Sequence, residues 1–220
     1  MKRSTTLVLA GLFALAAALP AAAEGLKLGL KAGYGFASAS TSTSLDTPQD
    51  VDPSGNFVGG LALEGQLYKA WTLETEVLWA RRTADATFFG GNTDYGQPMG
   101  DITAEYTFDT LEIPFHAKYR FPQGDFSPHV FFGWNTMIPL EIKSKNTADG
   151  ESITVKAKDQ FQSVWVALEL GAGFDWNVGD DTALTLDARY VYGLTDTAAV
   201  AGDSWKWRDV RILAGVKFDL

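Results

Sequence analysis

The chain contains no cysteine among its 220 residues and only two histidines. Without cysteine there is no disulfide and no thiolate-ligated metal site, so stability must come from backbone pairing and packing. Two histidines leave little material for acid–base catalysis near neutral pH. No apolar run reaches the roughly 20 residues that a transmembrane helix needs, which excludes a helical membrane protein.

Basic residues are also scarce, with 18 Lys and Arg against 27 Asp and Glu. Lys2 and Arg3 belong to a segment that we expect to be removed, which leaves 16 basic residues and a net charge of −11. A chain of this charge would repel the phosphate backbone of DNA or RNA. We therefore expect no nucleic acid partner.

The first 23 residues have the pattern of a secretory signal peptide. Two basic residues are followed by an apolar run over 7–19, and Pro20 precedes three alanines. We expect Sec-type export and cleavage near Ala23, since a signal peptide ends in small residues of this kind. The remaining residues, 24–220, are enough for one sizeable β domain, and we predict a single domain.

The mature chain shows a two-residue alternation that recurs about eight times. Over 111–121 the odd positions are apolar and most of the even positions are charged, and 210–218 alternates in the same way. This period predicts strands with one apolar face and one polar face. The predicted strands span residues 26–38, 56–67, 71–82, 103–121, 127–141, 160–177, 182–194 and 206–220.

The connections between these strands alternate in length. The short ones (68–70, 122–125 and 178–181) suit tight turns, and the last two contain Gly, Pro or Asp. The long ones are residues 39–55, 83–102, 142–159 and 195–205. Short periplasmic turns and long extracellular loops are typical of an outer-membrane barrel, and an even number of strands returns both ends to the periplasm.

The fourth predicted strand contains an irregularity in its phase. Tyr106 and Phe108 are apolar at even positions, whereas the run from Leu111 is apolar at odd positions. A bulge near Asp109 and Thr110 would place all of these apolar side chains on one face. We therefore expect Tyr106 and Phe108 on the outer face.

Aromatic residues gather at both rims of the apolar face. In a membrane barrel such rings form girdles at the two membrane–water interfaces, where one side of each ring is apolar and the other is wet. The residues that we assign to the girdles are Trp71, Trp79, Tyr106, Tyr119, Phe121, Trp176, Tyr192 and Phe218.

The polar face carries charges of both signs in near balance. A soluble lipocalin-like barrel would show the same period with its apolar face inside, so alternation alone does not decide between the two. The girdles and the balanced charges favour a membrane barrel whose lumen is filled by ion-paired side chains. The predicted lumen network is Glu64, Glu74, Glu76, Glu112, His116, Lys118, Arg120, Glu169, Asp187, Arg189, Arg211 and Lys217.

Four stretches of the chain resemble the small outer-membrane β-barrel proteins often described as the porin family, with the architecture of OmpA- and OmpX-type barrels. They are LKLGLKAGY (26–34), LETEVLW (73–79), LEIPFHAKY (111–119) and LDARYVYGL (186–194). The resemblance spans the mature chain apart from its long loops. It implies an all-β fold, an eight-stranded antiparallel transmembrane barrel in an up-and-down meander, in a Gram-negative outer membrane, and it implies almost nothing about function.

The last six residues, 215–220, resemble the signal that the barrel-assembly machinery reads in the final strand. They depart from the usual form because Leu220 stands where an aromatic residue is typical. The resemblance implies that this machinery is a partner of the chain.

Catalytic chemistry has little support in the residues. His116 is the one candidate base that the alternation places in the lumen, and a histidine within the charge network is the simpler interpretation. Some eight-stranded barrels modify lipid A, and Ser163 could supply a nucleophile, but no local signature joins it to His116. The loop aspartates lack calcium-ligand spacing. We predict no catalytic residue, no cofactor and no metal site.

Aromatic and basic residues also meet near the long loops. Trp205 and Trp207 could form an exposed surface that contacts lipopolysaccharide, or they could pack into the barrel mouth. The sequence leaves both readings open. We expect Arg81, Arg82, Lys143 and Lys145 near the same rim.

The leading functional hypothesis is a non-enzymatic barrel with a structural or surface-interaction role through its long extracellular loops. A narrow pore for ions or small solutes is the alternative, and a lipid A-modifying enzyme or a soluble lipocalin-like binder are further ones. The path is closed if Glu64, Glu112 and Glu169 pair with lumen cations across it. Expected partners are outer-membrane lipid and lipopolysaccharide, whereas the sequence identifies no extracellular ligand.

Overall fold

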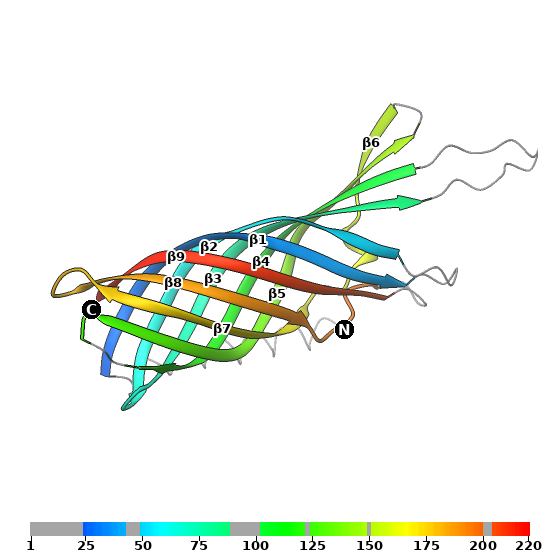
Figure 1. Ribbon diagram of the computed structural model, residues 1–220. Helices are drawn as coiled ribbons and strands as arrows, with labels where there is room; N and C mark the ends of the chain where they lie inside the picture. Colours follow the sequence, from blue (N-terminus) through cyan, green and yellow to red (C-terminus); the bar gives the residue numbers. More distant parts are fainter. Residues whose placement is uncertain (1–23, 43–48, 89–101, 122–123, 149–150, 200–203) are drawn as a thin grey trace, which may run out of the picture.

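The computed structural model describes the chain apart from residues 1–23, 43–48, 89–101, 122–123, 149–150 and 200–203. Its described part is a nine-stranded antiparallel sheet, eight strands of which close into a barrel (Figure 1). The expected signal peptide lies outside the described residues. The strands are β1 (Glu24–Ser42), β2 (Gln49–Tyr68), β3 (Trp71–Phe88), β4 (Ile102–Arg120), β5 (Phe126–Ala148), β6 (Glu151–Lys156), β7 (Trp165–Asn177), β8 (Thr182–Gly193) and β9 (Ser204–Asp219).

The barrel closes because its first and last strands pair with each other. The strand order is β4-β3-β2-β1-β9-β8-β7-β5-β6, and a further pairing of β4 with β5 completes the ring. The predicted eight-stranded antiparallel meander is therefore confirmed, with β6 as an additional strand outside the ring. Among the described residues, no helix is long and apolar enough to cross a membrane.

The strands extend further at the long-loop end than the sequence predicts. The expected loop over 142–159 is wrong, because β5 continues to Ala148 and β6 pairs back onto it. Strands β1 to β4 likewise reach into the other expected loops. The β-branched run of Ile153, Thr154 and Val155 has the propensity for this extension.

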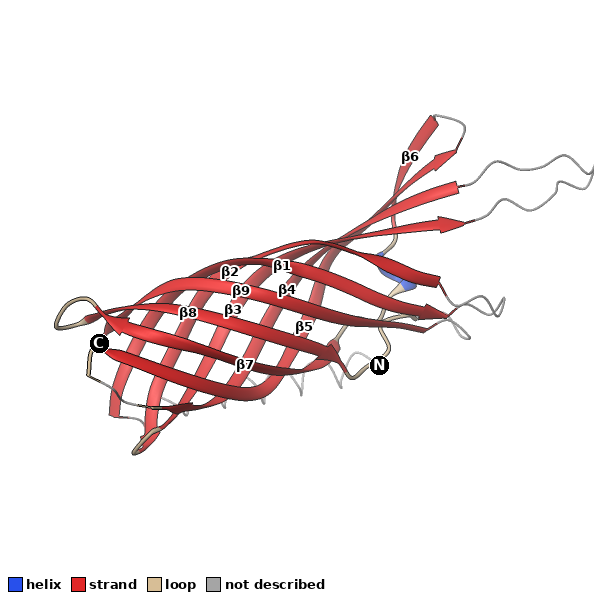
Figure 2. Cartoon of the chain, in the orientation of Figure 1, coloured by secondary structure: helices blue, strands red, loops and turns tan. Residues whose placement is uncertain are grey.

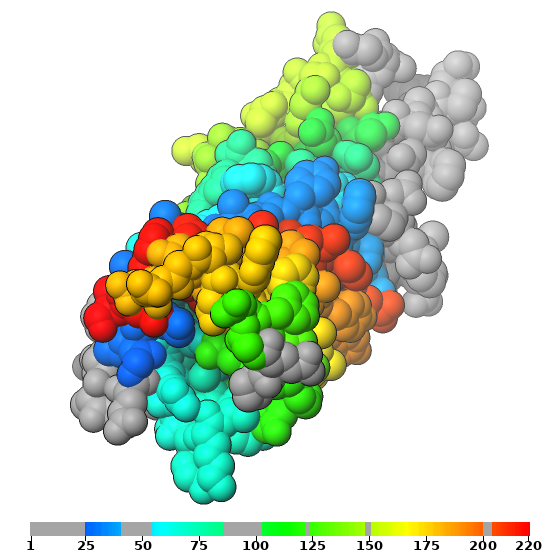
Figure 3. Space-filling model, turned by 60° about the vertical axis from the view of Figure 1, so that its left-hand side comes forward, coloured from blue at the N-terminus to red at the C-terminus, as the bar shows by residue number. Residues whose placement is uncertain are grey.

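The extended strands make the barrel wall uneven. The outer parts of β3 to β6 rise well beyond the rest of the rim, as Figure 1 and the space-filling view in Figure 3 show. The predicted strand over 160–177 begins only at Trp165, and a short 3-10 turn, η1 (Lys158–Gln160), precedes it at this rim (Figure 2). One side of the outer rim is thus a projecting sheet.

The predicted bulge in β4 is wrong. Strand β4 pairs with β3 without a break across Asp109 and Thr110, so its even positions face the lumen along its whole length. The register shift at this level belongs to β5, where Leu140 has no partner in β4. Tyr106 and Phe108 consequently point inward, and the girdle position predicted for Tyr106 is wrong.

The outer face of the barrel is apolar over its middle. The side chains there are exposed although they are large and hydrophobic, and a patch of this size is stable in lipid rather than in water. Of the predicted girdle, all residues except Tyr106 and the half-buried Tyr119 are 37–52% exposed on this face. The side chains between the rims include Leu28, Leu30, Leu61, Val77, Val130, Phe132, Leu168, Leu170, Leu186, Val210 and Ile212.

Gly133 marks a point where β4 and β5 approach too closely for a side chain. A Cβ at Gly133 would overlap the carbonyl oxygen of Phe115 and lie 3.0 Å from Cα of His116. These are backbone atoms, so no rotamer change relieves the overlap. We expect Gly133→Ala to lower the free energy of unfolding by about 1–3 kcal/mol, the usual cost of overpacking.

Urea titration of the refolded barrel, followed by the heat-dependent shift in gel mobility, measures this loss. Gly179→Ala is the matched control, because the nearest atom to its Cβ would be Thr182 Cβ at 3.9 Å. Equal stability of the two variants would contradict the close approach of the strands.

Candidate functional site

The lumen is packed with charged side chains. The two-residue period of each strand turns every second side chain inward, and a barrel of eight strands is narrow enough for these side chains to fill it. All twelve residues of the predicted network lie in the lumen, together with four that were not assigned to it, Lys31, Arg82, Asp175 and Asp209. The cations are Lys31, Arg82, Lys118, Arg120, Arg189, Arg211 and Lys217, and the carboxylates are Glu64, Glu74, Glu76, Glu112, Glu169, Asp175, Asp187 and Asp209.

Near the short turns, three cations share two carboxylates. Lys217 Nζ lies 2.9 Å from Glu64 and 2.9 Å from Asp175. Lys118 Nζ donates to Glu64 over 3.1 Å, and Arg120 donates to Asp175 over 2.8 Å and also to Glu64. This turn-side group spans the lumen from β2 and β4 to β7 and β9.

In the middle of the barrel, Lys31 and Arg189 form the central group. Lys31 Nζ lies 2.8 Å from Glu74, 2.7 Å from Glu76 and 2.9 Å from Asp187. Arg189 donates to Glu76 over 2.6 Å and to Asp187 over 2.8 Å. Glu74 also accepts a hydrogen bond from Lys118, which connects the central group to the turn-side group.

Towards the long loops, two arginines and two carboxylates form the loop-side group. Arg211 and the amide of Asn135 donate to Glu112 over 2.8 Å and 2.7 Å. Arg82 donates to Asp209 over 2.9 Å, and it also pairs with Glu112. Arg82 was expected near the rim, but the alternation of β3 turns it into the lumen, where it is fully buried.

The two histidines belong to the central group. His116 Nε2 lies 3.5 Å from Glu169 and its Nδ1 lies 3.8 Å from Glu74, so neither nitrogen makes a hydrogen bond of normal length. His129, to which the sequence gave no role, contacts Asp187 over 2.8 Å through Nε2. The ring of Phe131 packs against both histidines. They are fully buried, as the interpretation of a histidine within the charge network requires.

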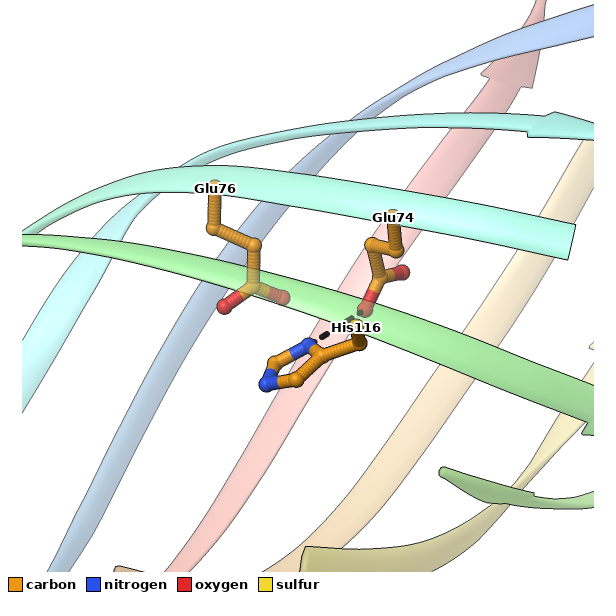
Figure 4. A group of neighbouring side chains, drawn as sticks. All are labelled: Glu74, Glu76 and His116. Atoms are coloured by element: carbon orange, nitrogen blue, oxygen red, sulfur yellow. Dashed lines mark ion pairs between the residues drawn. The ribbon is translucent and has the colours of Figure 1, made fainter. Parts of the chain in front are cut away.

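Glu74, Glu76 and His116 have the side-chain types of a metal site (Figure 4). Their potential ligand atoms all lie within 4.8 Å of one another. The Lys31 ammonium group already lies between the two carboxylates, and Arg189 holds Glu76 as well. A divalent cation would have to displace these partners, so the geometry is that of an ion-pair network.

The outer mouth of the lumen is closed by an apolar plug, the mouth cluster. It consists of the side chains Tyr106, Phe108, Phe161, Trp165, Trp205 and Trp207, with Met137 and Ile142 beside them. Of the two alternatives for the tryptophan pair, packing into the barrel mouth is the one observed.

Phe108 lies at the centre of the mouth cluster. Its ring centroid lies 4.9 Å from that of Trp207, 5.1 Å from that of Phe161 and 6.1 Å from that of Trp165, all in edge-on arrangements that aromatic pairs favour. The unbroken alternation of β4 turns Phe108 inward, whereas the predicted bulge had assigned it to the lipid.

A backbone strap holds Phe161 over the mouth. Gln162 N donates to Thr197 O over 2.8 Å, and Ala199 N donates to Gln160 O over 2.9 Å. The indole nitrogen of Trp165 donates to Gln162 O over 2.9 Å. The segment after η1 is thereby tied to the connection between β8 and β9.

Comparison with known proteins identifies the fold. A family model described as outer membrane protein beta-barrel domain matches residues 18–199. The chain is similar to the outer membrane protein OprG from Pseudomonas aeruginosa at 15% identity and a TM-score of 0.50, covering 90% of this chain and 97% of that chain. It is also similar to neisserial surface protein A at 16% identity and a TM-score of 0.49, covering 90% and 99%. Comparison with curated proteins gives no match.

Proposed function

The chain belongs to the family of outer-membrane β-barrel proteins, and from this premise we propose that it is a non-enzymatic barrel with a closed lumen. Members of this family reside in the outer membrane of Gram-negative bacteria. The barrel serves as a rigid support for its outer rim, through which it interacts with the cell surface.

The filled lumen is the observation that carries this proposal. Three groups of ion pairs follow one another along the barrel, and the mouth cluster covers them on the outer side. Glu64, Glu112 and Glu169 each pair with lumen cations, which is the condition for a closed path. Unpaired charges in such an interior would cost several kcal/mol each, so the network favours one fixed arrangement.

A lipid A-modifying activity has less support. Such an enzyme needs a base that reaches the lipid at one rim. His116 is fully buried in the central group, below both the loop-side group and the mouth cluster. This depth supports a structural role for the histidine.

The outer rim supports a surface-interaction role. The projecting parts of β3 to β6 carry polar and charged side chains above the apolar band, on the side of the long loops. A rigid wall beneath them fixes their orientation toward lipopolysaccharide or another surface molecule. The loop tips that would complete this surface fall on residues 43–48, 89–101, 149–150 and 200–203, outside the described residues.

Strand β9 supports recognition by the barrel-assembly machinery. Its outward side chains alternate up to the end of the chain, with Val210, Ile212 and Phe218 exposed on the lipid face. Leu220 is also exposed beyond the strand. We propose that the machinery reads this apolar row.

We expect the refolded mature chain to give no discrete conductance steps in a planar bilayer. The ion-paired lumen leaves no continuous path, and the shift of gel mobility on heating verifies that the barrel is closed. Reproducible single-channel steps from a folded barrel would contradict the closed lumen and favour the narrow pore.

A further inference from the structure

Strands β5 and β6 form a hairpin that projects from the outer rim (Figure 1), and lysines gather at its base. Lys143 lies directly opposite Lys156 in the register of the two strands, and both side chains are exposed. Lys145 is exposed two residues further along β5, with Glu105 at 4.0 Å. Like charges directly opposite each other destabilise an antiparallel pair. An anion between the two ammonium groups would relieve this repulsion.

Carboxylates near this face balance only part of its charge. Glu141 lies 2.9 Å from Lys143 and neutralises it. Lys158 Nζ donates to the carbonyl oxygen of Leu140 over 3.0 Å. Among the described residues, no carboxylate lies within 4.0 Å of Lys156 or Lys158. A negatively charged ligand could therefore pair with the ammonium groups of both Lys156 and Lys158.

A cavity of about 230 Å³ lies between these groups and the barrel wall. Leu140 forms an apolar part of its lining, because it faces outward in the same phase of β5 as Val130 and Phe132 and is 48% exposed. The lining thus combines apolar side chains with two lysines and one carboxylate, Glu141, which is paired with Lys143. Its full lining is Leu140, Glu141, Ile142, Lys156 and Lys158.

The cavity lies where the apolar outer face of the barrel ends. Along β5 the outward side chains Val130, Phe132 and Trp134 are exposed in the lipid band, Leu140 continues this row, and Lys143 follows. This border lies on the long-loop side of the barrel. In the outer membrane that level is occupied by the phosphorylated sugars that join the acyl chains of the outer leaflet to its polysaccharide.

We propose that this cavity binds a phosphate group of an outer-leaflet glycolipid of the lipopolysaccharide class. Lys156 and Lys158 donate charge-assisted hydrogen bonds to the phosphate oxygens. Leu140 contacts the start of the acyl chains, and Lys143 adds a cation at the edge of the site. The site deepens the proposed surface role, because it names one molecule that the outer rim holds.

Binding of bisphosphorylated lipid A to the refolded full barrel in detergent micelles tests the site. We expect the double variant K156Q/K158Q to bind at least about tenfold more weakly, since two charge-assisted hydrogen bonds are lost. The matched control is K206Q/R208Q, which removes two exposed charges from β9 at the same rim. Both variants change exposed side chains, and the heat-dependent gel shift verifies that each is folded.

Two further probes separate the sources of the phosphate. The first probe is dephosphorylated lipid A. We expect it to bind the unmodified barrel weakly, with the same affinity that bisphosphorylated lipid A has for K156Q/K158Q. The second probe is inorganic phosphate, which we expect to displace lipid A only at high concentration. Equal losses in the two double variants, or equal binding of the dephosphorylated lipid, would overturn the proposal. Displacement by inorganic phosphate or by polyglutamate as effective as by free lipid A would also overturn it, in favour of a general anion site or an acidic protein partner.

The lipid-binding test and the conductance experiment test two different proposals, and either proposal can be contradicted without the other. A conducting barrel would contradict the closed lumen and leave lipid A binding by Lys156 and Lys158 unchanged. Loss of the lipid site would leave the ion-paired lumen as it is.

Discussion

Replacing Glu112 with alanine is expected to lower the free energy of unfolding by about 3–5 kcal/mol, the usual cost of breaking a buried ion pair from one side. Glu112 accepts hydrogen bonds from Arg211 and Asn135 and pairs with Arg82. All four side chains are fully buried. Without Glu112, Asp209 would have to balance both buried guanidinium groups alone.

Urea titration of the refolded barrel in lipid vesicles measures this loss. Asp109→Ala is the control, because Asp109 lies on the same strand and pairs with Arg81 on the outer surface. The side chain of Arg81 is half exposed, so this pair should contribute less than about 1 kcal/mol. If Glu112→Ala costs no more than Asp109→Ala, the buried pairs of the loop-side group do not hold the folded barrel together.

Replacing Phe108 with alanine is expected to cost about 3–5 kcal/mol as well, for a different reason. Phe108 is completely buried, with the rings of Phe161, Trp165, Trp205 and Trp207 around it. Its removal leaves a cavity between side chains that the strap and the strands hold in place, so they cannot collapse to fill it.

The same urea titration, read by tryptophan fluorescence, measures this effect. Phe132→Ala is the matched control, because Phe132 is 53% exposed on the outer face, where lipid fills the space that the ring leaves. We expect Phe132→Ala to cost clearly less. We also expect Phe108→Ala to stay electrically silent, since the three charge groups still block the lumen. Equal losses in the two variants would contradict the central place of Phe108 in the mouth cluster.

The period of two was sufficient to predict the barrel. It placed the eight strands of the ring, and it assigned Glu64, Glu112, Arg189 and the rest of the predicted network to the polar face without any knowledge of their partners. Lys31 and Asp209 sit at inward positions of their own strands, where the same rule places them, although the predicted network did not include them. The rule could not predict which cation pairs with which carboxylate, because partners such as Lys31 and Asp187 lie 156 residues apart in the sequence.

The errors at Tyr106 and Phe108 share a physical cause. The prediction assumed that apolar side chains face the lipid and polar side chains face the lumen along the whole strand. This holds only within the membrane band. Above the band the lumen is closed by aromatic rings, so Tyr106 and Phe108 point inward in the ordinary phase of β4. The predicted bulge in β4 is absent, and the register shift at this level lies in β5 at Leu140. A residue pattern in one strand could not show which of two paired strands carries the bulge.

The seam between β1 and β9 determines how this barrel can fold. Neighbouring strands along the chain can pair as local hairpins, whereas the seam joins residues from opposite ends, such as Lys27 with Asp219. The entropy of closing so long a loop must be overcome before any of its hydrogen bonds form. Until then both strands would carry rows of unpaired N–H and C=O groups, each of which costs several kcal/mol in lipid. Half-closed intermediates are therefore unstable within the bilayer, so insertion and ring closure must proceed as one cooperative step.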